Sequence, residues 1–305
     1  MTLQEIEVFL TVVRTGNVSA AAQALYITQP AVSRHMNALE RELDCVLLER
    51  GRGQRQVELT ERGRDFLPAA EKLRHAWLEA MEAPKGEEGR TLRVSSINSL
   101  TAYLMPGILR NFAQERPGSN LEYMQMSSNE AYAAVARGEI DLALISDDMY
   151  HPQVETTPLF REPMVLLAGA ESGLEGVLHP ARLDPSKQVR APWNPEYDLW
   201  HSFWFRSGAR PRLVLNHMSM LEEVFSWRGD WADIWAVAPV MVARAVAQKT
   251  GARICALEDG PPDEIIYTLR GRKRKPELTQ AFLECLKREL EKHPDWRYTN
   301  KKAAG

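Results

Sequence analysis

The sequence predicts an α/β protein in which a short helical region precedes a longer region of alternating strands and helices. Three observations support this fold class. Apolar residues recur at helical spacing over residues 3–43. A polar stretch that contains two glycines, residues 84–89, then interrupts the pattern. Beyond it, short apolar runs alternate with amphipathic stretches, the order typical of sheets covered by helices.

The length and composition of the chain fit a protein of two or three globular domains. It has 305 residues, of which 44% are hydrophobic, enough for ordinary cores. The net charge is −3, and residues 1–90 hold 12 basic and 14 acidic side chains. Overall charge therefore does not indicate a polyanion partner, and a DNA-binding role has to be argued from local patterns.

The cysteines and the apolar runs indicate a cytoplasmic protein that does not enter a membrane. Cys45, Cys255 and Cys285 are far apart and form no CxxC pair, which fits a reducing compartment. The first residues of the chain lack the apolar run of a signal peptide. The most apolar stretch, residues 234–243, is too short to span a bilayer.

Three helices are predicted in residues 3–43. The first ends at Gly16, and the second, residues 20–25, is rich in alanine and can be capped by Ser19. The third can be capped by Thr28 and has Pro30 in its first turn, where a missing N–H costs little. Its apolar side chains form one inward stripe: Val32, Met36, Leu39 and Leu43.

The opposite side of the third helix carries side chains that can read DNA. Gln29, Ser33, Arg34 and Asn37 point away from the apolar stripe. Glutamine can pair with adenine, arginine can fork onto guanine, and serine suits phosphates or base edges. An ordinary solvated face is the alternative for any single residue. Two short helices joined by a tight turn, the second with this polar face, favour a helix-turn-helix.

Residues 47–60 predict a β-hairpin wing. Two short apolar segments flank a tip of glycines and arginines, with Arg50, Arg52 and Arg55 as the only basic cluster in this region. A wing tip would place the three guanidinium groups against phosphates or in a minor groove. A solvated loop tip is the alternative.

These residues closely resemble the LysR-type transcriptional regulators over about sixty positions. The matching residues are 16–25, 28–34, Leu39, Glu40, Leu43, Leu47, Glu49, Arg50, Leu59, Thr60 and Gly63. Leu48 departs from the family, which often has phenylalanine there. The resemblance implies a winged helix-turn-helix that binds double-stranded DNA. The predicted DNA-binding residues are Ser19, Thr28, Gln29, Pro30, Ser33, Arg34, Asn37, Arg50, Arg52 and Arg55.

Residues 61–82 predict a long linker helix that contains Pro68. A heptad seam runs along it through Phe66, Ala70, Leu73, Trp77 and Ala80. The helix could pack on its own domain, but the resemblance favours a dimerisation helix, and two recognition helices on a two-fold axis suit a palindromic site. Family members are commonly tetramers, so a homodimer and a homotetramer both stay open, and RNA polymerase is a candidate partner.

The remainder predicts two α/β lobes with doubly wound sheets. Strands are predicted at 92–94, 121–126, 141–145, 164–167, 189–190, 213–215, 235–237 and 265–269, and helices at 103–114, 130–137 and 276–291. The resemblance implies a domain similar to periplasmic solute-binding proteins, with a small-molecule effector in the cleft between the lobes. The predicted domains are residues 1–60, 61–89 and 90–305, with lobe I about 90–160 and 263–293 and lobe II about 161–262.

Polar residues at strand ends and an aromatic stretch are the candidate effector-binding residues. The strand-end residues are Ser96, Asn98, Ser99, Thr101, Ser128 and Asn129. They can cap helices or bind an effector carboxylate at the carboxyl edge of a sheet. The aromatic-stretch residues are Trp193, Trp200, His201 and Trp204. They can line a pocket or pack the core, and on the first reading the effector has an apolar or aromatic part.

An enzyme and a solute-binding protein are the alternative functions. The sequence has no Walker loop, no GxSxG, no HExxH and no metal-spaced set of histidines and cysteines. We therefore predict neither catalysis nor a cofactor. A solute-binding protein would suit the C-terminal part alone, but not the N-terminal helices. The segment 227–233 stands where the family often has glycines, so pocket details cannot be carried over from relatives.

Overall fold

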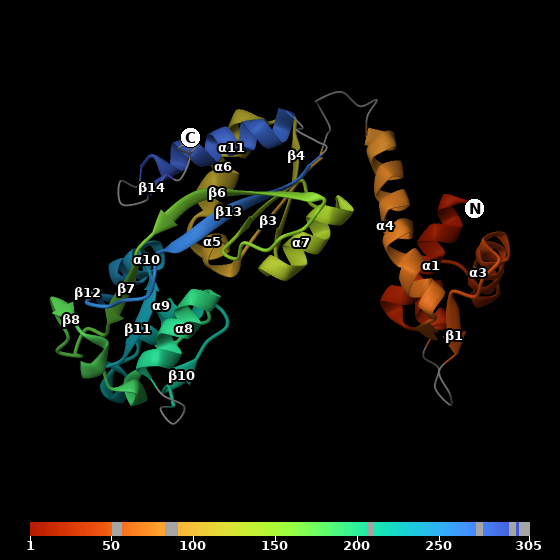
Figure 1. Cartoon of the computed structure of the whole chain (residues 1–305). Helices are drawn as coiled ribbons and strands as arrows, with labels where there is room; N and C mark the ends of the chain where they lie inside the picture. The colour runs from red at the N-terminus through yellow and green to blue at the C-terminus, as the bar shows by residue number, and fades with distance from the viewer. Residues whose placement is uncertain (51–56, 83–90, 206–209, 273–276, 293–296, 299–305) are drawn as a thin grey trace. The chain divides into compact units, whose positions relative to one another are not determined.

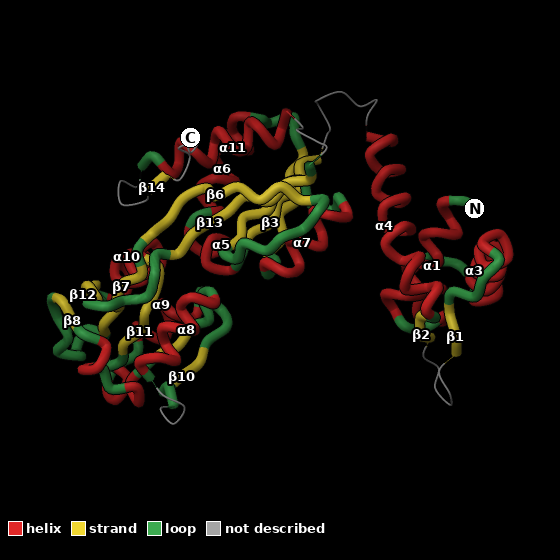
Figure 2. Tube along the Cα trace, viewed as in Figure 1, coloured by secondary structure: helices red, strands yellow, loops and turns green. Residues whose placement is uncertain are grey.

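The computed structural model describes residues 1–50, 57–82, 91–205, 210–272, 277–292 and 297–298. They divide into two compact units, Met1–Arg90 with Arg137–Glu139, and the rest of the chain. Each unit is followed separately in Figures 1 and 2. The three-domain division stays a prediction. No helix in these ranges combines the length and hydrophobicity needed to cross a membrane.

The first unit begins with the three predicted helices, α1 (Leu3–Thr15), α2 (Val18–Ala24) and α3 (Gln29–Leu43). Gly16 ends α1 in the left-handed conformation at φ 64°, which glycine adopts without strain. The prediction that Ser19 caps α2 is wrong. The side chain of Asn17 accepts the N–H groups of Ser19 and Ala20 at 2.7 and 3.3 Å, so Ser19 already lies inside the first turn.

The core of the first unit confirms the inward stripe of α3. Val32 and Leu39 are fully buried and Met36 is 7% exposed, while Leu43 is partly buried. They pack with Phe9 of α1, and each such side chain stabilises the fold by about 1.5–3 kcal/mol. Thr28 does precede α3, but its hydroxyl makes no capping hydrogen bond. Burial of the stripe therefore fixes how the helix is rotated.

The wing and the linker helix follow as predicted. Strand β1 (Leu48–Arg50) pairs antiparallel with β2 (Val57–Leu59), and α4 (Glu61–Glu82) includes Pro68. A Cβ at Gly63 would overlap the carbonyl oxygen of Leu47, which explains why glycine stands at the start of α4.

The apolar residues of the linker helix fall into a buried part and an exposed part. Phe66 packs against Phe9 with ring centroids 5.4 Å apart, and Ala70 is fully buried. Leu73 and Trp77 are each 44% exposed. The heptad seam is thus split within one protomer: its first half belongs to the core of the first unit, and only its second half is free to meet a partner.

The second unit contains a six-stranded sheet of order β14-β6-β13-β5-β3-β4. Its strands are β3 (Thr91–Ser96), β4 (Asn120–Gln125), β5 (Leu142–Ile145), β6 (Val154–Glu162), β13 (Glu264–Gly271) and β14 (Arg297–Tyr298). Its helices are α5 (Asn98–Tyr103), α6 (Met105–Glu115), α7 (Ser128–Arg137) and α11 (Glu277–Leu290). β4, β3 and β5 are parallel, whereas β13 runs antiparallel to β5 and β6, so the sheet is mixed rather than doubly wound throughout.

Two prolines explain two differences between the structure and the secondary-structure prediction. The helix predicted at 103–114 corresponds to α6, which begins at Met105, and the short α5 before it was not predicted. Pro106 favours a helix start here, because inside a continuous helix it would lack an N–H and clash with the preceding turn. Strand β6 was not predicted, since Pro158 interrupts its pattern. The ladder between β6 and β13 shifts register between Ile266 and Tyr267, which faces Pro158, and such a bulge accommodates the proline.

The second lobe holds a smaller sheet of order β11-β7-β12-β8. Its strands are β7 (Met164–Ala168), β8 (Val177–Leu178), β11 (Trp235–Pro239) and β12 (Arg253–Leu257), beside the parallel pair β9 (Val189–Arg190) and β10 (Leu213–Val214). Its helices are α8 (Pro195–Trp204), α9 (Met220–Ser226) and α10 (Val240–Thr250). The chain enters this lobe after β6 and returns through β13 (Figure 1), and buried apolar residues of both lobes form one continuous cluster.

Candidate functional site

The polar face of α3 is open to solvent. All six predicted residues at its start and along this face are exposed: Thr28, Gln29, Pro30, Ser33, Arg34 and Asn37. The opposite face holds the buried Val32 and Leu39. A helix with one face locked in a core and the other rich in amide, hydroxyl and guanidinium groups can present those groups to base edges.

Ser19 connects the two helices at the start of this face. Its hydroxyl accepts a hydrogen bond from Nε2 of Gln29 at 2.5 Å. The contact joins α2 to the first residue of α3 and leaves the amide oxygen of Gln29 out of this bond. Arg34 makes no ion pair within the described ranges, so its guanidinium is available to a ligand.

The structure describes only part of the basic cluster predicted in the wing. Arg50 is the last residue of β1 and pairs with Val57 through the backbone. Arg52 and Arg55 lie outside the described residues, as does the side chain of Arg50. Their contact with DNA stays a prediction.

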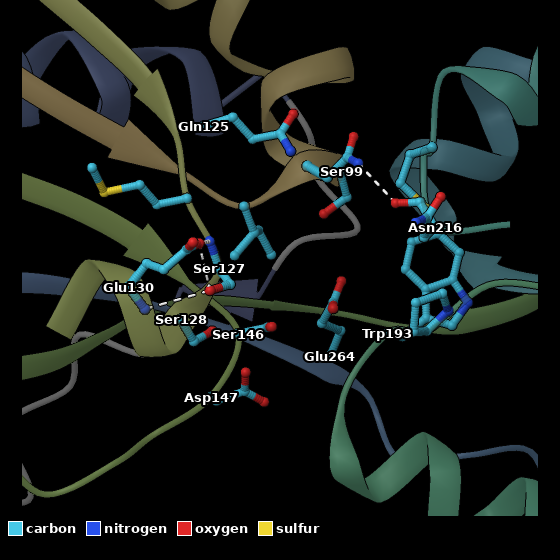
Figure 3. A pocket seen from close by; sticks show the side chains of 15 residues that line it. Ser99, Gln125, Ser127, Ser128, Glu130, Ser146, Asp147, Trp193, Asn216 and Glu264 are labelled. Carbon is cyan, nitrogen blue, oxygen red and sulfur yellow. Dashed lines mark hydrogen bonds between the residues drawn. The ribbon is translucent and has the colours of Figure 1, made fainter. Parts of the chain in front are cut away.

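A cavity of about 320 Å³ lies between the two lobes of the second unit. Ser99 and Ser128 line it from the starts of α5 and α7, and Glu264 lines it from the first position of β13 (Figure 3). Trp193 and Asn216 line it from the second lobe. Residues distant in sequence therefore converge where the chain passes between lobes.

Asn98 joins the two lobes at the rim of this cavity. Its side-chain amide donates to the carbonyl oxygen of Asn216 at 3.1 Å (Figure 3). The hydroxyl of Tyr103 donates to the carbonyl oxygen of Met218 at 3.0 Å. A ligand that changes the position of α5 would thus alter contacts between the lobes.

Ser96 and Thr101 do not line the cavity, contrary to the sequence prediction. Their hydroxyl groups lie 2.6 Å from the hydroxyl of Tyr123 and 3.1 Å from each other. Burial of Tyr123 raises its pKa, so the phenol stays neutral and completes this network. The two residues hold β3, α5 and β4 together beneath the cavity.

Ser127 and Ser128 at the start of α7 both line the cavity, but only Ser127 caps the helix. The backbone N–H and hydroxyl of Ser127 donate to Oε2 of Glu130 at 2.8 and 2.7 Å, and the N–H of Glu130 donates back to Ser127 at 3.4 Å, a capping box. Ser128 is 5% exposed, and its hydroxyl has no hydrogen-bond partner in the described structure. Asn129 is exposed and lines an adjoining cavity.

Of the four aromatic-stretch residues, only Trp193 reaches the cavity. Its indole N–H donates to the carbonyl oxygen of Val237 at 2.7 Å, which fixes the ring. Trp200 instead donates to the carbonyl oxygen of Asp259 at 2.6 Å, and its ring stacks on Tyr197. The core interpretation holds for this residue.

His201 and Trp204 also lie away from the cavity. His201 is 5% exposed and its Nε2 lies 2.8 Å from Oε1 of Gln188. Burial lowers its pKa to about 4, with Arg190 acting in the same direction, so the imidazole is neutral near pH 7. Trp204 packs edge-on against His179 at 4.8 Å. Neither residue lines the cavity as predicted from the sequence, because α8 turns both toward its own lobe.

Two acidic residues of the cavity were not predicted. Glu264 is 1% exposed, and neither carboxylate oxygen has a partner at hydrogen-bond geometry in the described structure. Burial, followed by Glu162 and Asp147, raises its pKa well above the ordinary value, although the nearby Asn194 acts in the opposite direction. Asp147 lines the same cavity with a buried Oδ1 that also lacks a partner. The available signal was the pair of acids, Asp263 and Glu264, directly before the apolar run 265–269.

Two family models match the chain. "Bacterial regulatory helix-turn-helix protein, lysR family" matches residues 3–64, and "LysR substrate binding domain" matches residues 85–291. The chain belongs to the LysR family. The match covers both units and agrees with the exposed recognition face and the interlobe cavity.

Curated relatives align with parts of this LysR-family chain. The HTH-type transcriptional regulator ClcR of Pseudomonas putida is 35% identical over 146 residues, which cover 47% of this chain and 49% of ClcR. The Hca operon transcriptional activator HcaR of Escherichia coli strain K12 is 29% identical over 190 residues, or 60% of this chain and 63% of HcaR. The chain spans about half the length of the first of these relatives.

Solved LysR-family structures share the fold over nearly the whole chain. CbnR has a TM-score of 0.66 at 21% identity and covers 95% of this chain and 99% of its own. A full-length variant of OxyR from Pseudomonas aeruginosa has a TM-score of 0.69 at 17% identity, with 99% of each chain covered. At these identities the likeness shows a common architecture and leaves the ligand open.

Proposed function

We propose that this LysR-family protein is a sequence-specific transcription regulator that binds double-stranded DNA and responds to a small-molecule effector. The observation that carries the proposal is the solvent-facing polar side of α3 opposite a fully buried stripe. Arginine, glutamine and asparagine are the side chains that pair bidentately with base edges. Full-length CbnR is known in complex with its target DNA, and it shares this fold at a TM-score of 0.63.

In this proposal α3 enters a major groove and the wing follows the backbone. Arg34 and Gln29 read base edges, while Ser33, Asn37 and the wing arginines contact phosphates or adjacent bases. Pro30 and Thr28 set the start of the helix against the backbone. Ser19 acts by holding Gln29 in place.

The proposal includes a homodimer or homotetramer built on α4. The second half of the linker helix exposes Leu73, Trp77 and Met81, apolar side chains that a partner helix would cover. A two-fold pair would present two α3 helices to a palindromic site. The proposed location is the cytoplasm, with RNA polymerase as a further partner and no catalytic activity or cofactor.

The effector is proposed to occupy the interlobe cavity. Ser99, Ser128 and Trp193 line it, and Asn98 links its rim to the second lobe. A ligand at such a junction shifts the equilibrium between two arrangements of the lobes, and the size of the shift is set by the difference in its affinity for the two. Asn129 would contact the part of a longer effector that extends into the adjoining cavity.

Binding of the full chain to the DNA upstream of its own gene tests the proposal. Fluorescence anisotropy would compare this fragment with a shuffled fragment of equal length and composition. We expect the native fragment to bind on the order of 10³-fold more tightly or better, with an affinity that falls steeply with salt. Equal affinity for the two fragments over a range of salt concentrations would contradict sequence-specific regulation and favour a solute-binding protein.

A further inference from the structure

The cavity and its neighbour are lined by acids and by no basic side chain of the described residues. Asp147 lines both, Glu264 lines the first, and Asp148, Glu196 and Asp263 line the second. Two further lining acids are already engaged: Asp198 pairs with Arg190 at 2.8 Å and Glu130 caps its own helix. The free lining charge is therefore negative.

Glu264 is the deepest of these acids, and it points into the cavity. It is 1% exposed, and within the described structure neither carboxylate oxygen has a partner at hydrogen-bond geometry, although the side chain of Asn194 lies close enough to lower its pKa. In Figure 3 its carboxylate is directed into the space between Ser128 and Trp193. Ser128 adds a second buried, unpartnered oxygen. Leaving such acceptors unsatisfied is costly, so these positions call for a hydrogen-bond donor.

One donor that could attract an anion, the N–H of Ser127 before α7, is already occupied. Helix α7 begins at the cavity, and a helix start normally offers N–H groups to a ligand carboxylate or phosphate. Here the carboxylate of Glu130 accepts the N–H and hydroxyl of Ser127. A ligand carboxylate would find the N–H and hydroxyl of Ser127 taken and would also lie beside Asp147, where like charges repel because little water screens them.

We propose that the cavity binds a small organic cation whose ammonium or guanidinium group donates to Glu264, Ser128 and Asp147. The inference rests on the proposed function, because it assigns the chemical class of the effector of that same site. Trp193 supplies an aromatic surface for the cation or its apolar part. The proposal names an organic cation because the described residues include no group of three or more His, Cys, Asp or Glu placed to hold a metal ion.

The ionisation of Glu264 agrees with this assignment. Burial, Glu162 and Asp147 raise its pKa well above the ordinary value, so the carboxyl keeps its proton readily when no counter-charge is present. A bound cation favours the charged form and forms a hydrogen-bonded ion pair out of water, which is among the stronger polar interactions in proteins.

Calorimetry on the full chain with matched probes tests the proposal. Each probe set shares one carbon skeleton and differs in charge: butylamine, butanol and butyrate; benzylamine, benzyl alcohol and benzoate. Ethylguanidinium is added as a planar cation. We expect at least one cation to bind and to raise the unfolding temperature, with its neutral and anionic counterparts at least about tenfold weaker.

Glu264→Gln locates the binding, with Glu258→Gln as the matched control. Glu258 is exposed and lines neither cavity, so its substitution removes the same charge elsewhere. We expect Glu264→Gln to stay folded, since it removes a buried carboxylate, and to weaken the cation about tenfold or more. Unchanged affinity in Glu264→Gln, tighter binding of a carboxylate, or no binding by any cation would each overturn the proposal.

DNA binding, measured separately, distinguishes this failure from failure of the proposed function. A cation that binds at Glu264 without altering DNA binding supports the charge assignment and contradicts the effector role. A carboxylate that alters DNA binding and loses its effect in Glu264→Gln supports the effector role and overturns the charge assignment.

Discussion

The recognition face of α3 and the interlobe cavity differ in how their residues are distributed along the chain. The face is built from residues 28–37, which belong to a single helix and its N-cap. The helical spacing of the apolar side chains is therefore enough to predict which polar residues are exposed. The cavity gathers Ser99, Ser128, Trp193 and Glu264 from both lobes. A local pattern identifies the first surface, whereas the second exists only because the chain passes twice between lobes.

The largest effect is expected from a substitution that destabilises the first unit and leaves the second unit intact, because it removes a buried side chain beneath the recognition face of α3. Leu39→Ala empties a fully buried position of α3, and we expect the first unit to lose about 2–5 kcal/mol of stability. Chemical denaturation would show this loss, and DNA binding would fall with it. Ligand binding by the second unit should persist. Asn37→Ala, on the exposed side of the same helix, is the control and should leave stability nearly unchanged.

A pronounced pH-dependent effect on stability is expected in the second unit. Glu162 is fully buried, and burial raises its pKa to about 8, against the hydrogen bond from the N–H of Met241 and the charge of Arg244. The unfolded chain releases this proton near pH 4.5, the folded chain near 8. Its contribution to stability is therefore complete below pH 4.5 and is lost as pH rises to 8, by about 1.4 kcal/mol per pH unit at most.

Glu162→Gln isolates that contribution. The amide oxygen can still accept the Met241 N–H, but the group no longer titrates. Opposite Glu162 on β13 stands Glu264, so the double variant with Glu264→Gln is needed to remove both buried carboxyls. Thermal unfolding between pH 5 and 8 should become flatter in each variant. An unchanged slope in the double variant would show that neither carboxyl governs the stability of this unit.

The contrast between face and cavity also explains what the sequence could predict. Helix spacing, the wing and the β/α order follow from local patterns, and the structure reproduces them. Ser96 and Trp200 were predicted to line the cavity, but they do not. A position at a strand end or in an aromatic run does not reveal which part of the structure the side chain contacts. Glu264 was missed because its place in the cavity depends on residues distant in sequence, such as Ser128 and Trp193, which line the same space.

A smaller effect tests whether the recognition face reads bases. Arg34→Ala should reduce the preference for the native fragment by about 1–3 kcal/mol if the guanidinium forks onto a base. Anisotropy with native and shuffled fragments measures that preference. Arg14→Ala removes one exposed arginine from α1, outside the proposed face, and should preserve the ratio. If both variants lower both affinities equally, Arg34 contacts only the backbone.

The smallest effect distinguishes the capping role of Ser127 from the ligand-binding role proposed for Ser128, although both residues line the cavity. Ser127→Ala removes the hydroxyl of the capping box and should cost about 0.5–2 kcal/mol of stability. Ser128→Ala removes a buried hydroxyl that has no partner in the described structure, so the ligand-free protein should keep or slightly gain stability. Calorimetry should then show weaker cation binding for Ser128→Ala than for Ser127→Ala. The reverse order would mean that the start of α7 serves the ligand through its cap, as in an anion site.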